Sequence, residues 1–177
     1  KKNKVELLNG FGKISDANGR LRNVEVKDKD GKLITVTGKN VIIATGARAR
    51  LLPGIEPDGV SIWTYKEAMV PSALPKSLLI IGSGAIGVEF ASFYNDMGVD
   101  VTLVEVLDKI LPVEDQEISL FAEQTFSKQG IKIKTSSKVL DLKKHAKSVD
   151  VSIETNGVVS SLKVDKVILA VGIIGNT

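Results

Sequence analysis

Three closely spaced glycines form the segment of this sequence that is best suited to binding a charged ligand. Gly82, Gly84 and Gly87 follow the apolar residues 78–81 and precede a stretch with helical periodicity. In a Gly-x-Gly-x-x-Gly turn, the first glycine permits the tight turn, the second lets the backbone approach a pyrophosphate, and the third lets the helix pack closely on the strand. The N–H groups at the start of the helix add partial positive charge. We therefore expect a dinucleotide site here, rather than a glycine-rich turn without a ligand.

One acidic residue stands at the distance from this turn that a dinucleotide site requires. Glu105 follows Gly82 by 23 residues and ends the next apolar run. At that position a carboxylate accepts a hydrogen bond from the adenosine ribose, and its charge repels a 2′-phosphate. Residues 106–109 contain no arginine and offer only Lys109 as a cation, so we expect NAD to be preferred over NADP. The alternative interpretation of Glu105 is an exposed glutamate at a strand end.

Alternating strands and helices surround these two motifs. Apolar runs at residues 78–81, 100–105 and 131–135 predict strands, and the segments between them have helical periodicity. Strands that alternate with helices are typical of a parallel sheet with right-handed crossovers. The sequence therefore predicts an α/β fold with a Rossmann-type parallel sheet.

Each predicted helix has an apolar face and a clear end. The first should stop at Gly98, and its apolar face is formed by Ile86, Phe90, Phe93, Tyr94 and Met97. The second should be capped by Asp115 and stop at Gly130, and the residues that should face the sheet are Ile118, Phe121, Ala122, Thr125 and Phe126.

The last part of the chain has strand-like periodicity instead of a third helix. Residues 149–155 and 158–164 alternate around the turn sequence Asn156-Gly157, which favours a tight hairpin. The apolar residues 167–171 then predict a further buried strand. We expect a β-meander to replace the third crossover helix.

The first 70 residues have a different pattern. Runs at residues 5–14, 23–27 and 33–37 predict a small antiparallel meander, and residues 41–44 predict a strand buried on both faces. Residues 51–77 contain four of the five prolines and predict an irregular crossover. We place a domain boundary in this crossover, so that one domain comprises residues 1–70 and the other residues 71–177.

Composition excludes several kinds of protein. With 43% hydrophobic and 25% charged residues among 177, the sequence predicts a soluble globular chain. Residues 1–50 have a net charge of +7 and residues 51–177 of −4, but the basic residues are spread along strand-like sequence, so we expect no nucleic acid partner. No apolar run is long enough to span a membrane, and we expect no membrane association. The absence of cysteine excludes disulfides and thiolate metal sites within these residues, and we expect no metal.

The sequence resembles the pyridine-nucleotide disulfide oxidoreductases over essentially its whole length. The motifs that carry the resemblance lie at residues 9–14, 41–46, 53–54, 82–89, 101–105 and 167–172. Within the family it is most similar to the branch that oxidises dihydrolipoyl groups in 2-oxo-acid dehydrogenase complexes, with FAD as the bound cofactor and NAD as the electron acceptor. The resemblance implies that residues 1–70 are part of an FAD-binding domain and its crossover, and that residues 71–177 are the NAD-binding domain.

The resemblance also implies two sets of cofactor-binding residues. Those that it places around NAD are Gly82, Ser83, Gly84, Ala85, Ile86, Gly87, Val88, Glu89, Glu105, Val139 and Gly172. Those that it places against FAD are Gly12, Thr45, Gly46 and Ala47. Glu89 could instead face solvent, and Val139 could instead belong to the core.

Several features of the family are missing from these residues. The resemblance implies an FAD fingerprint, a Cys-x4-Cys disulfide and an interface domain with a catalytic histidine and glutamate, and none is present. Gly172-Ile-Ile-Gly-Asn176 also stands where many relatives have Gly-Arg-x-Pro-Asn. We expect His145 to be solvated and to have no catalytic role, because no cysteine is available to it. The chain is thus expected to be an inactive fragment with no catalytic residue of its own.

The expected parent is an enzyme, an NAD-dependent flavoprotein that acts as a homodimer in the cytoplasm, or in the mitochondrial matrix of a eukaryote. Its expected partners are the lipoyl domains of a 2-oxo-acid dehydrogenase complex. Two alternatives stay open: a related NADH oxidase, peroxidase or ferredoxin reductase would use the same motifs, and a standalone NAD-binding module would have its own partner surface.

Overall fold

The computed structural model describes residues 3–177, except for the side chains of residues 17 and 18. The chain forms two compact units, of which the first ends at Thr45 and the second comprises Gly46–Thr177. Residues 47–49 and 62–63 pair with strands of the second unit, so this division lies before residue 70. The domain boundary in the crossover stays a prediction.

The first unit contains a three-stranded antiparallel sheet. Its strands β1 (Phe11–Asn18), β2 (Leu21–Lys27) and β3 (Leu33–Gly38) are joined in the order β1-β2-β3. The expected meander is therefore present, but its first strand begins at Phe11 rather than at residue 5. Among the described side chains of this unit, Val26 is the only hydrophobic one that is buried, so the sheet has little core of its own.

Residues 41–44 form no strand, which corrects the expectation of a strand buried on both faces. Ile42 and Ile43 are 90% and 71% exposed. A strand of this kind needs hydrogen-bonded neighbours on both sides. Within residues 3–177, no strand pairs with this run.

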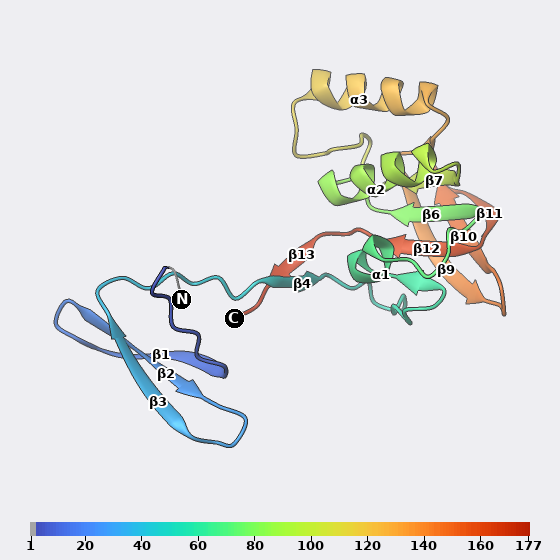
Figure 1. Ribbon diagram of the computed structural model, residues 1–177. Helices are drawn as coiled ribbons and strands as arrows, with labels where there is room; N and C mark the ends of the chain where they lie inside the picture. Colours follow the sequence, from blue (N-terminus) through green and yellow to red (C-terminus); the bar gives the residue numbers. More distant parts are fainter. Residues whose placement is uncertain (1–2) are drawn as a thin grey trace. The chain divides into compact units, whose positions relative to one another are not determined.

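The second unit is built on the expected parallel sheet (Figure 1). Its strand order is β5-β12-β6-β7-β8, and all four pairings are parallel. The strands are β5 (Ile62–Trp63), β6 (Ser77–Ile81), β7 (Asp100–Val104), β8 (Lys132–Lys134) and β12 (Lys166–Leu169). The chain continues from β6 to β7 and β8 on one side, while β12 and β5 lie on the other, so the strand order reverses beside β6.

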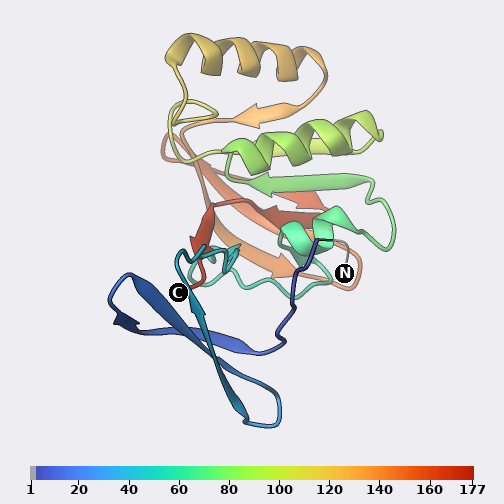
Figure 2. The same cartoon turned by 60° about the vertical axis from the view of Figure 1, so that its left-hand side comes forward.

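Helices pack on one face of this sheet (Figure 2). They are α1 (Tyr65–Met69), α2 (Ala85–Asp96) and α3 (Gln116–Lys128). Alternate residues of the strands point to opposite faces. Leu78 and Ile80 accordingly join the core beneath the helices, whereas Leu79 and Ile81 join a second core on the other face.

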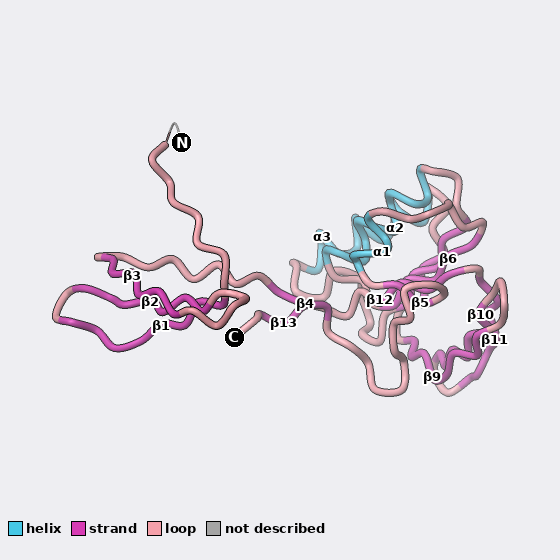
Figure 3. Tube along the Cα trace, turned by 60° about the horizontal axis from the view of Figure 1, so that its bottom comes forward, coloured by secondary structure: helices cyan, strands magenta, loops and turns pink. Residues whose placement is uncertain are grey.

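A second antiparallel sheet covers the opposite face of the parallel sheet (Figure 3). It consists of β9 (Ser137–Lys144), β10 (Val149–Thr155) and β11 (Val158–Val164), in the order β11-β10-β9. Asn156 and Gly157 both have positive φ, 51° and 79°, and form the two-residue hairpin between β10 and β11. The expected β-meander in place of a crossover helix is therefore confirmed.

The buried face of α2 agrees in part with the expected one, since Tyr94 is buried and Ile86 and Phe90 pack against the core. Gly87, Val88, Ala91 and Tyr94 are buried, whereas Phe93 and Met97 are about half exposed. A Cβ at Gly87 would overlap the carbonyl oxygen of Gly82, which shows how closely this helix approaches the end of β6. The close approach at Gly87 is at the start of the helix, and farther along the same face the large side chain of Tyr94 is completely buried.

The buried face of α3 also differs, although Asp115 caps the helix as expected by accepting a hydrogen bond from the Glu117 N–H at 2.8 Å. Ser119 is buried, and Ala122 and Phe126 pack against the core. Ile118 and Phe121, which we expected to face the sheet, are 55% and 70% exposed. The contact stripe therefore runs through Ser119, Ala122 and Phe126.

Residues 46–64 contain two short strands, β4 (Ala47–Ala49) and β5, which pair with strands of the second unit. Strands β4 and β13 (Ile173–Gly175) form a two-stranded antiparallel sheet. Asp58 then accepts hydrogen bonds from the N–H groups of Val60, Ser61 and Ile62 at 2.7–2.9 Å. This turn leads directly into β5, which pairs with β12, so the expected irregular crossover contains a short strand of the sheet.

Candidate functional site

A cleft of about 880 Å3 lies at the carboxyl ends of the parallel strands. Residues that follow β6, β7 and β12 line it, and this is where α/β sheets bind ligands when the strand order reverses. The lining comprises residues 50, 52–55, 81–86, 104–106, 112, 137–140 and 170–172, all from the second unit.

The three glycines of the turn have three different surroundings. Gly82 has a φ of +99°, and a Cβ there would lie 2.5 Å from the carbonyl oxygen of Ala170. At Gly87 a Cβ would overlap the Gly82 carbonyl oxygen. At Gly84 a Cβ would meet nothing within 4 Å. Gly82 and Gly87 are thus required by the backbone geometry, and Gly84 leaves open space in the cleft.

Gly84 also begins helix α2. It is the N-cap residue, and no side chain forms a capping hydrogen bond there. The first N–H groups of a helix have no partner within the helix and carry partial positive charge. Because Gly84, Ala85 and Ile86 line the cleft, this end of α2 is suited to an anion.

The carboxylate of Glu105 lies beside the turn and is held by three donors. Its Oε2 accepts hydrogen bonds from the Ser83 N–H at 2.9 Å and from the Ser83 hydroxyl at 2.7 Å. Its Oε1 accepts a hydrogen bond from the Leu107 N–H at 3.0 Å. The side chain is only 7% exposed and still lines the cleft. Glu105 is therefore a fixed, partly covered anion at the edge of the cleft.

The loop after β7 is tied to the same turn. The Leu111 N–H donates to the Ser83 carbonyl oxygen at 2.9 Å, and the Ser119 hydroxyl donates to the Leu111 carbonyl oxygen at 3.1 Å. The Lys109 ammonium donates to the Glu114 carbonyl oxygen at 2.8 Å. The cation nearest to Glu105 in sequence is thus engaged within its own loop.

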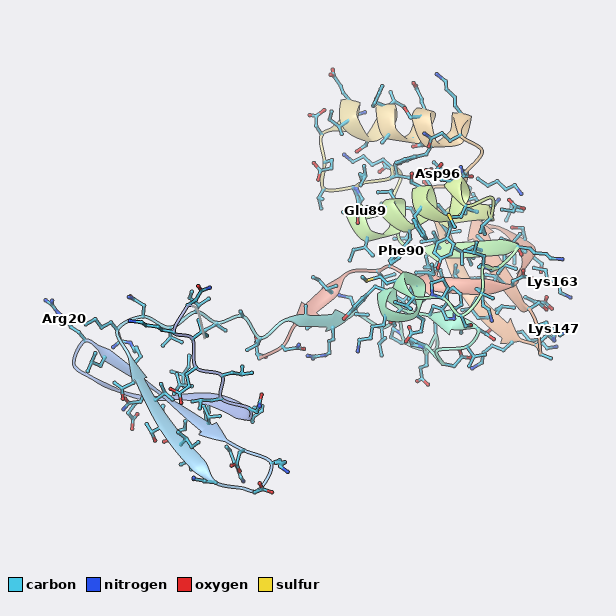
Figure 4. The ribbon with its side chains drawn as sticks, in the orientation of Figure 1. Arg20, Glu89, Phe90, Asp96, Lys147 and Lys163 are labelled. Carbon is cyan, nitrogen blue, oxygen red and sulfur yellow. The ribbon has the colours of Figure 1, made fainter. Side chains whose placement is uncertain are left out.

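The structure brings most of the predicted NAD-binding residues together. The cleft is lined by Gly82, Ser83, Gly84, Ala85, Ile86, Glu105, Val139 and Gly172. Gly87 and Val88 are buried within α2 instead, and Glu89 is exposed on the same helix (Figure 4). The roles assigned to these residues stay predictions.

Sequence reasoning missed two basic residues of the cleft. Arg50 and Lys138 line it, and the backbone N–H of Arg50 donates to the Gly172 carbonyl oxygen at 2.9 Å. Arg50 directly follows β4 and Lys138 is the second residue of β9, and neither belongs to a motif whose spacing singles it out. Their charges add to the suitability of the cleft for a phosphorylated ligand.

The four residues expected to contact FAD fall in different units. Gly12 lies in β1 and Thr45 at the end of the first unit, whereas Gly46 and Ala47 begin the second. The Gly46 carbonyl oxygen accepts a hydrogen bond from the Asn176 N–H at 3.0 Å, and Ala47 pairs with Gly175 in β4 and β13. Their contact with a flavin stays a prediction.

Other kinds of site have little support in the described part of the chain. His145 lies at the end of a hairpin, where its Nε2 is 2.8 Å from Oδ2 of Asp150 and both side chains are partly exposed. Among residues 3–177, no group of three or more His, Cys, Asp or Glu side chains is arranged to hold a metal ion. None of the described helices is both long and apolar enough to cross a membrane.

Comparison with known proteins gives consistent matches. Residues 1–177 match the sequence profile of the pyridine nucleotide-disulphide oxidoreductases. The chain is 58% identical over 143 residues to a dihydrolipoyl dehydrogenase of Rhizobium etli, covering 80% of this chain and 30% of the relative. It is 44% identical over 177 residues to the dihydrolipoyl dehydrogenase of Zymomonas mobilis, covering 99% of this chain and 37% of the relative. The chain thus spans about a third of the length of these relatives.

Two solved structures are also similar to this chain. LpdA from Mycobacterium tuberculosis has a TM-score of 0.79 at 29% identity, over 95% of this chain and 36% of its own. The HOCl-induced flavoprotein disulfide reductase RclA from Escherichia coli has a TM-score of 0.71 at 28% identity, over 94% and 36%. Since the profile match covers all 177 residues, the chain belongs to the pyridine nucleotide-disulphide oxidoreductase family.

Proposed function

We propose that this chain is the NAD-binding part of a dihydrolipoyl dehydrogenase, together with a portion of its FAD-binding domain. The observation that carries the proposal is the cleft at the sheet edge, where the open position at Gly84 lies beside the fixed carboxylate of Glu105. The sequence relatives reported above are dihydrolipoyl dehydrogenases, so an NADH oxidase, a peroxidase, a ferredoxin reductase or a standalone module is not favoured.

The residues of the cleft fit NAD. The open space at Gly84 and the N-terminus of α2 would receive the pyrophosphate, with Arg50 and Lys138 supplying positive charge nearby. Glu105 would accept a hydrogen bond from the adenosine ribose. When bound, NAD supplies the electron acceptor, and the contribution of these residues is to hold it in a fixed orientation.

The remaining parts of the proposed enzyme involve residues outside this stretch. These 177 residues contain no cysteine, so they supply no dithiol for exchange with a dihydrolipoyl group. Gly12, Thr45, Gly46 and Ala47 would contact FAD in the intact protein. We further propose that the parent is a homodimer that acts on lipoyl domains of a 2-oxo-acid dehydrogenase complex in the cytoplasm, or in the mitochondrial matrix of a eukaryote.

Titration calorimetry with NAD and NADP tests the proposed function. We expect NAD to bind measurably and NADP to bind at least about tenfold more weakly, because Glu105 repels the 2′-phosphate. Glu105→Ala should narrow this preference without abolishing binding, since the pyrophosphate site is retained. Equal or tighter binding of NADP by the unmodified chain would show that the proposed cofactor is wrong.

A further inference from the structure

Ser83 occupies a position that the glycine motif leaves free, since the pattern fixes only Gly82, Gly84 and Gly87. Its side chain is nevertheless completely buried. Both of its donors, the backbone N–H and the hydroxyl, are directed to one oxygen of Glu105, at 2.9 and 2.7 Å. The serine therefore does more than fill space between two glycines.

The hydrogen bonds leave the Glu105 carboxylate little freedom. A carboxylate has about four acceptor positions. Ser83 uses two of them and the Leu107 N–H uses a third, at 3.0 Å from Oε1. About one position then remains for a ligand in the cleft that Glu105 lines. Hydrogen bonds to a charged group are stronger than those between neutral groups, so the hydroxyl of Ser83 contributes substantially to this arrangement.

Ser83 is itself held in place. Its carbonyl oxygen accepts a hydrogen bond from the Leu111 N–H at 2.9 Å, and Leu111 is in turn bonded through its carbonyl oxygen to the buried Ser119 of α3. On the other side, the Gly82 N–H donates to the Val104 carbonyl oxygen at 2.9 Å. The turn, the end of β7 and the following loop thus form one connected network around Glu105.

We propose that Ser83 is a positioning residue that orients the Glu105 carboxylate toward the adenosine ribose, and that the preference for NAD over NADP depends on its hydroxyl. The inference rests on the proposed function. A carboxylate that is already oriented loses less conformational freedom when the ribose hydroxyl binds. Without the Ser83 hydroxyl, Glu105 gains freedom to rotate, so it holds the ribose less well and can also turn away from a 2′-phosphate.

The contact is isolated by comparing ADP with 2′-deoxy-ADP, which differ only in the 2′-hydroxyl. Affinities of the full chain are measured by titration calorimetry. We expect the unmodified chain to prefer ADP by about tenfold, the value of one hydrogen bond to a charged group. Ser83→Ala should reduce the ratio of ADP to 2′-deoxy-ADP affinity to about two or less. It should also reduce the ratio of NAD to NADP affinity.

Three further variants distinguish positioning from a structural effect. Ser77→Ala is the matched control, because Ser77 is a partly buried serine at the start of β6, outside the cleft lining, whose hydroxyl accepts a hydrogen bond from the Asp165 N–H at 3.1 Å. This control variant should have the same ratio of ADP to 2′-deoxy-ADP affinity as the unmodified chain. In a Glu105→Ala background, Ser83→Ala should no longer change the ratio. Ser83→Cys keeps nearly the same volume with a weaker donor and should give an intermediate ratio.

The outcomes separate the two proposals. If the unmodified chain binds NAD but does not distinguish ADP from 2′-deoxy-ADP, or if Ser83→Ala keeps the unmodified ratio, the role of Ser83 is wrong and the proposed function stands. If the unmodified chain binds no NAD, the proposed function is wrong and the inference is overturned with it. Should Ser83→Ala fail to fold, the ratio measured for Ser83→Cys decides, and an unchanged ratio overturns the inference.

Discussion

Two segments of this chain have similar sequence patterns and different structures. Residues 41–46 and 78–82 each combine four apolar residues with a glycine at positive φ, +76° at Gly46 and +99° at Gly82. Residues 78–81 lie in β6, and Ile80 is completely buried. Residues 41–44 form no strand, and Ile42 is 90% exposed.

Neighbouring strands account for the difference. Ile80 pairs with Leu103 of β7 on one side and with Ile168 of β12 on the other. Helices cover one face of this strand, and the sheet formed by β9, β10 and β11 covers the other. Residues 41–44 have no paired strand within the described part of the chain. An apolar run therefore predicts a buried strand only when the chain also supplies its partners.

The largest expected effect comes from truncating one isoleucine in each of the two segments. Ile80→Ala should lower the free energy of unfolding by about 3–4 kcal/mol, because it removes buried methyl groups and leaves a cavity. Ile42→Ala should change it by less than about 0.5 kcal/mol, as is usual for exposed positions. Urea denaturation of both variants checks this. Similar losses for the two variants would contradict the contrast between the segments.

A smaller effect is expected at Asp58, which organises the turn before β5 and so supports the edge of the sheet that contains β6. Burial raises the pKa of this carboxyl, but the N–H groups of Ile62, Val60 and Ser61, together with Lys144 at 3.2 Å, outweigh burial and hold the pKa well below its usual 3.8. Asp58→Ala should lower the free energy of unfolding by about 2 kcal/mol at neutral pH.

The pH dependence at Asp58 has a definite sign. A lowered pKa in the folded state means that the stabilisation is present above pH 3.8 and is lost as the pH falls toward the lowered value. The stability difference between the unmodified chain and Asp58→Asn should therefore be largest at neutral pH and shrink in acid. Unfolding curves between roughly pH 7 and 3 measure it, and a constant difference would show that the charge of Asp58 is unimportant.

The smallest expected effect concerns the helices that cover β6. The buried Tyr94 hydroxyl of α2 donates to the Ala68 carbonyl oxygen of α1 at 2.8 Å, and burial raises the pKa of this hydroxyl. Tyr94→Phe should lower the free energy of unfolding by about 1 kcal/mol. Tyr65→Phe is the control, because the Tyr65 hydroxyl lies 3.4 Å from its acceptor, the Ala47 carbonyl oxygen. Equal losses in the two variants would contradict the importance of the helix contact.

Much of the second unit could be predicted from the sequence, because its signals are local. The turn at Gly82, the strand that ends before Glu105 and the hairpin at Asn156 and Gly157 each depend on residues within one or two elements. The first two of these features also line part of the cleft. The network from Ser83 to Glu105 and Leu111 could not be predicted, since nothing in the spacing fixes which hydrogen bonds a serine forms.

The errors arose where packing between elements decides the outcome. Periodicity indicated Phe93, Met97 and Phe121 as facing the core, but they are 50%, 52% and 70% exposed. Tyr94 and Phe126, on the same predicted faces, do pack in the core. The strand predicted at residues 41–44 did not form, and no strand among residues 3–177 pairs with this run.

The central claim, that the cleft beside Gly84 binds NAD, is tested most directly by thermal unfolding of Gly84→Val with and without NAD. The φ of Gly84 is −65° and a side chain there meets no neighbour, so the variant should lose only about 1 kcal/mol of stability, from a poorer N-cap. Saturating NAD, at about 100 times its Kd, should stabilise the unmodified chain by about 2.7 kcal/mol and raise its Tm. Gly175→Val is the control, because a Cβ at Gly175 also meets nothing within 4 Å and Gly175 lies outside the cleft lining. Its Tm should still rise when NAD is added. The account predicts that Gly84→Val loses the rise completely, and an undiminished rise in that variant would contradict it.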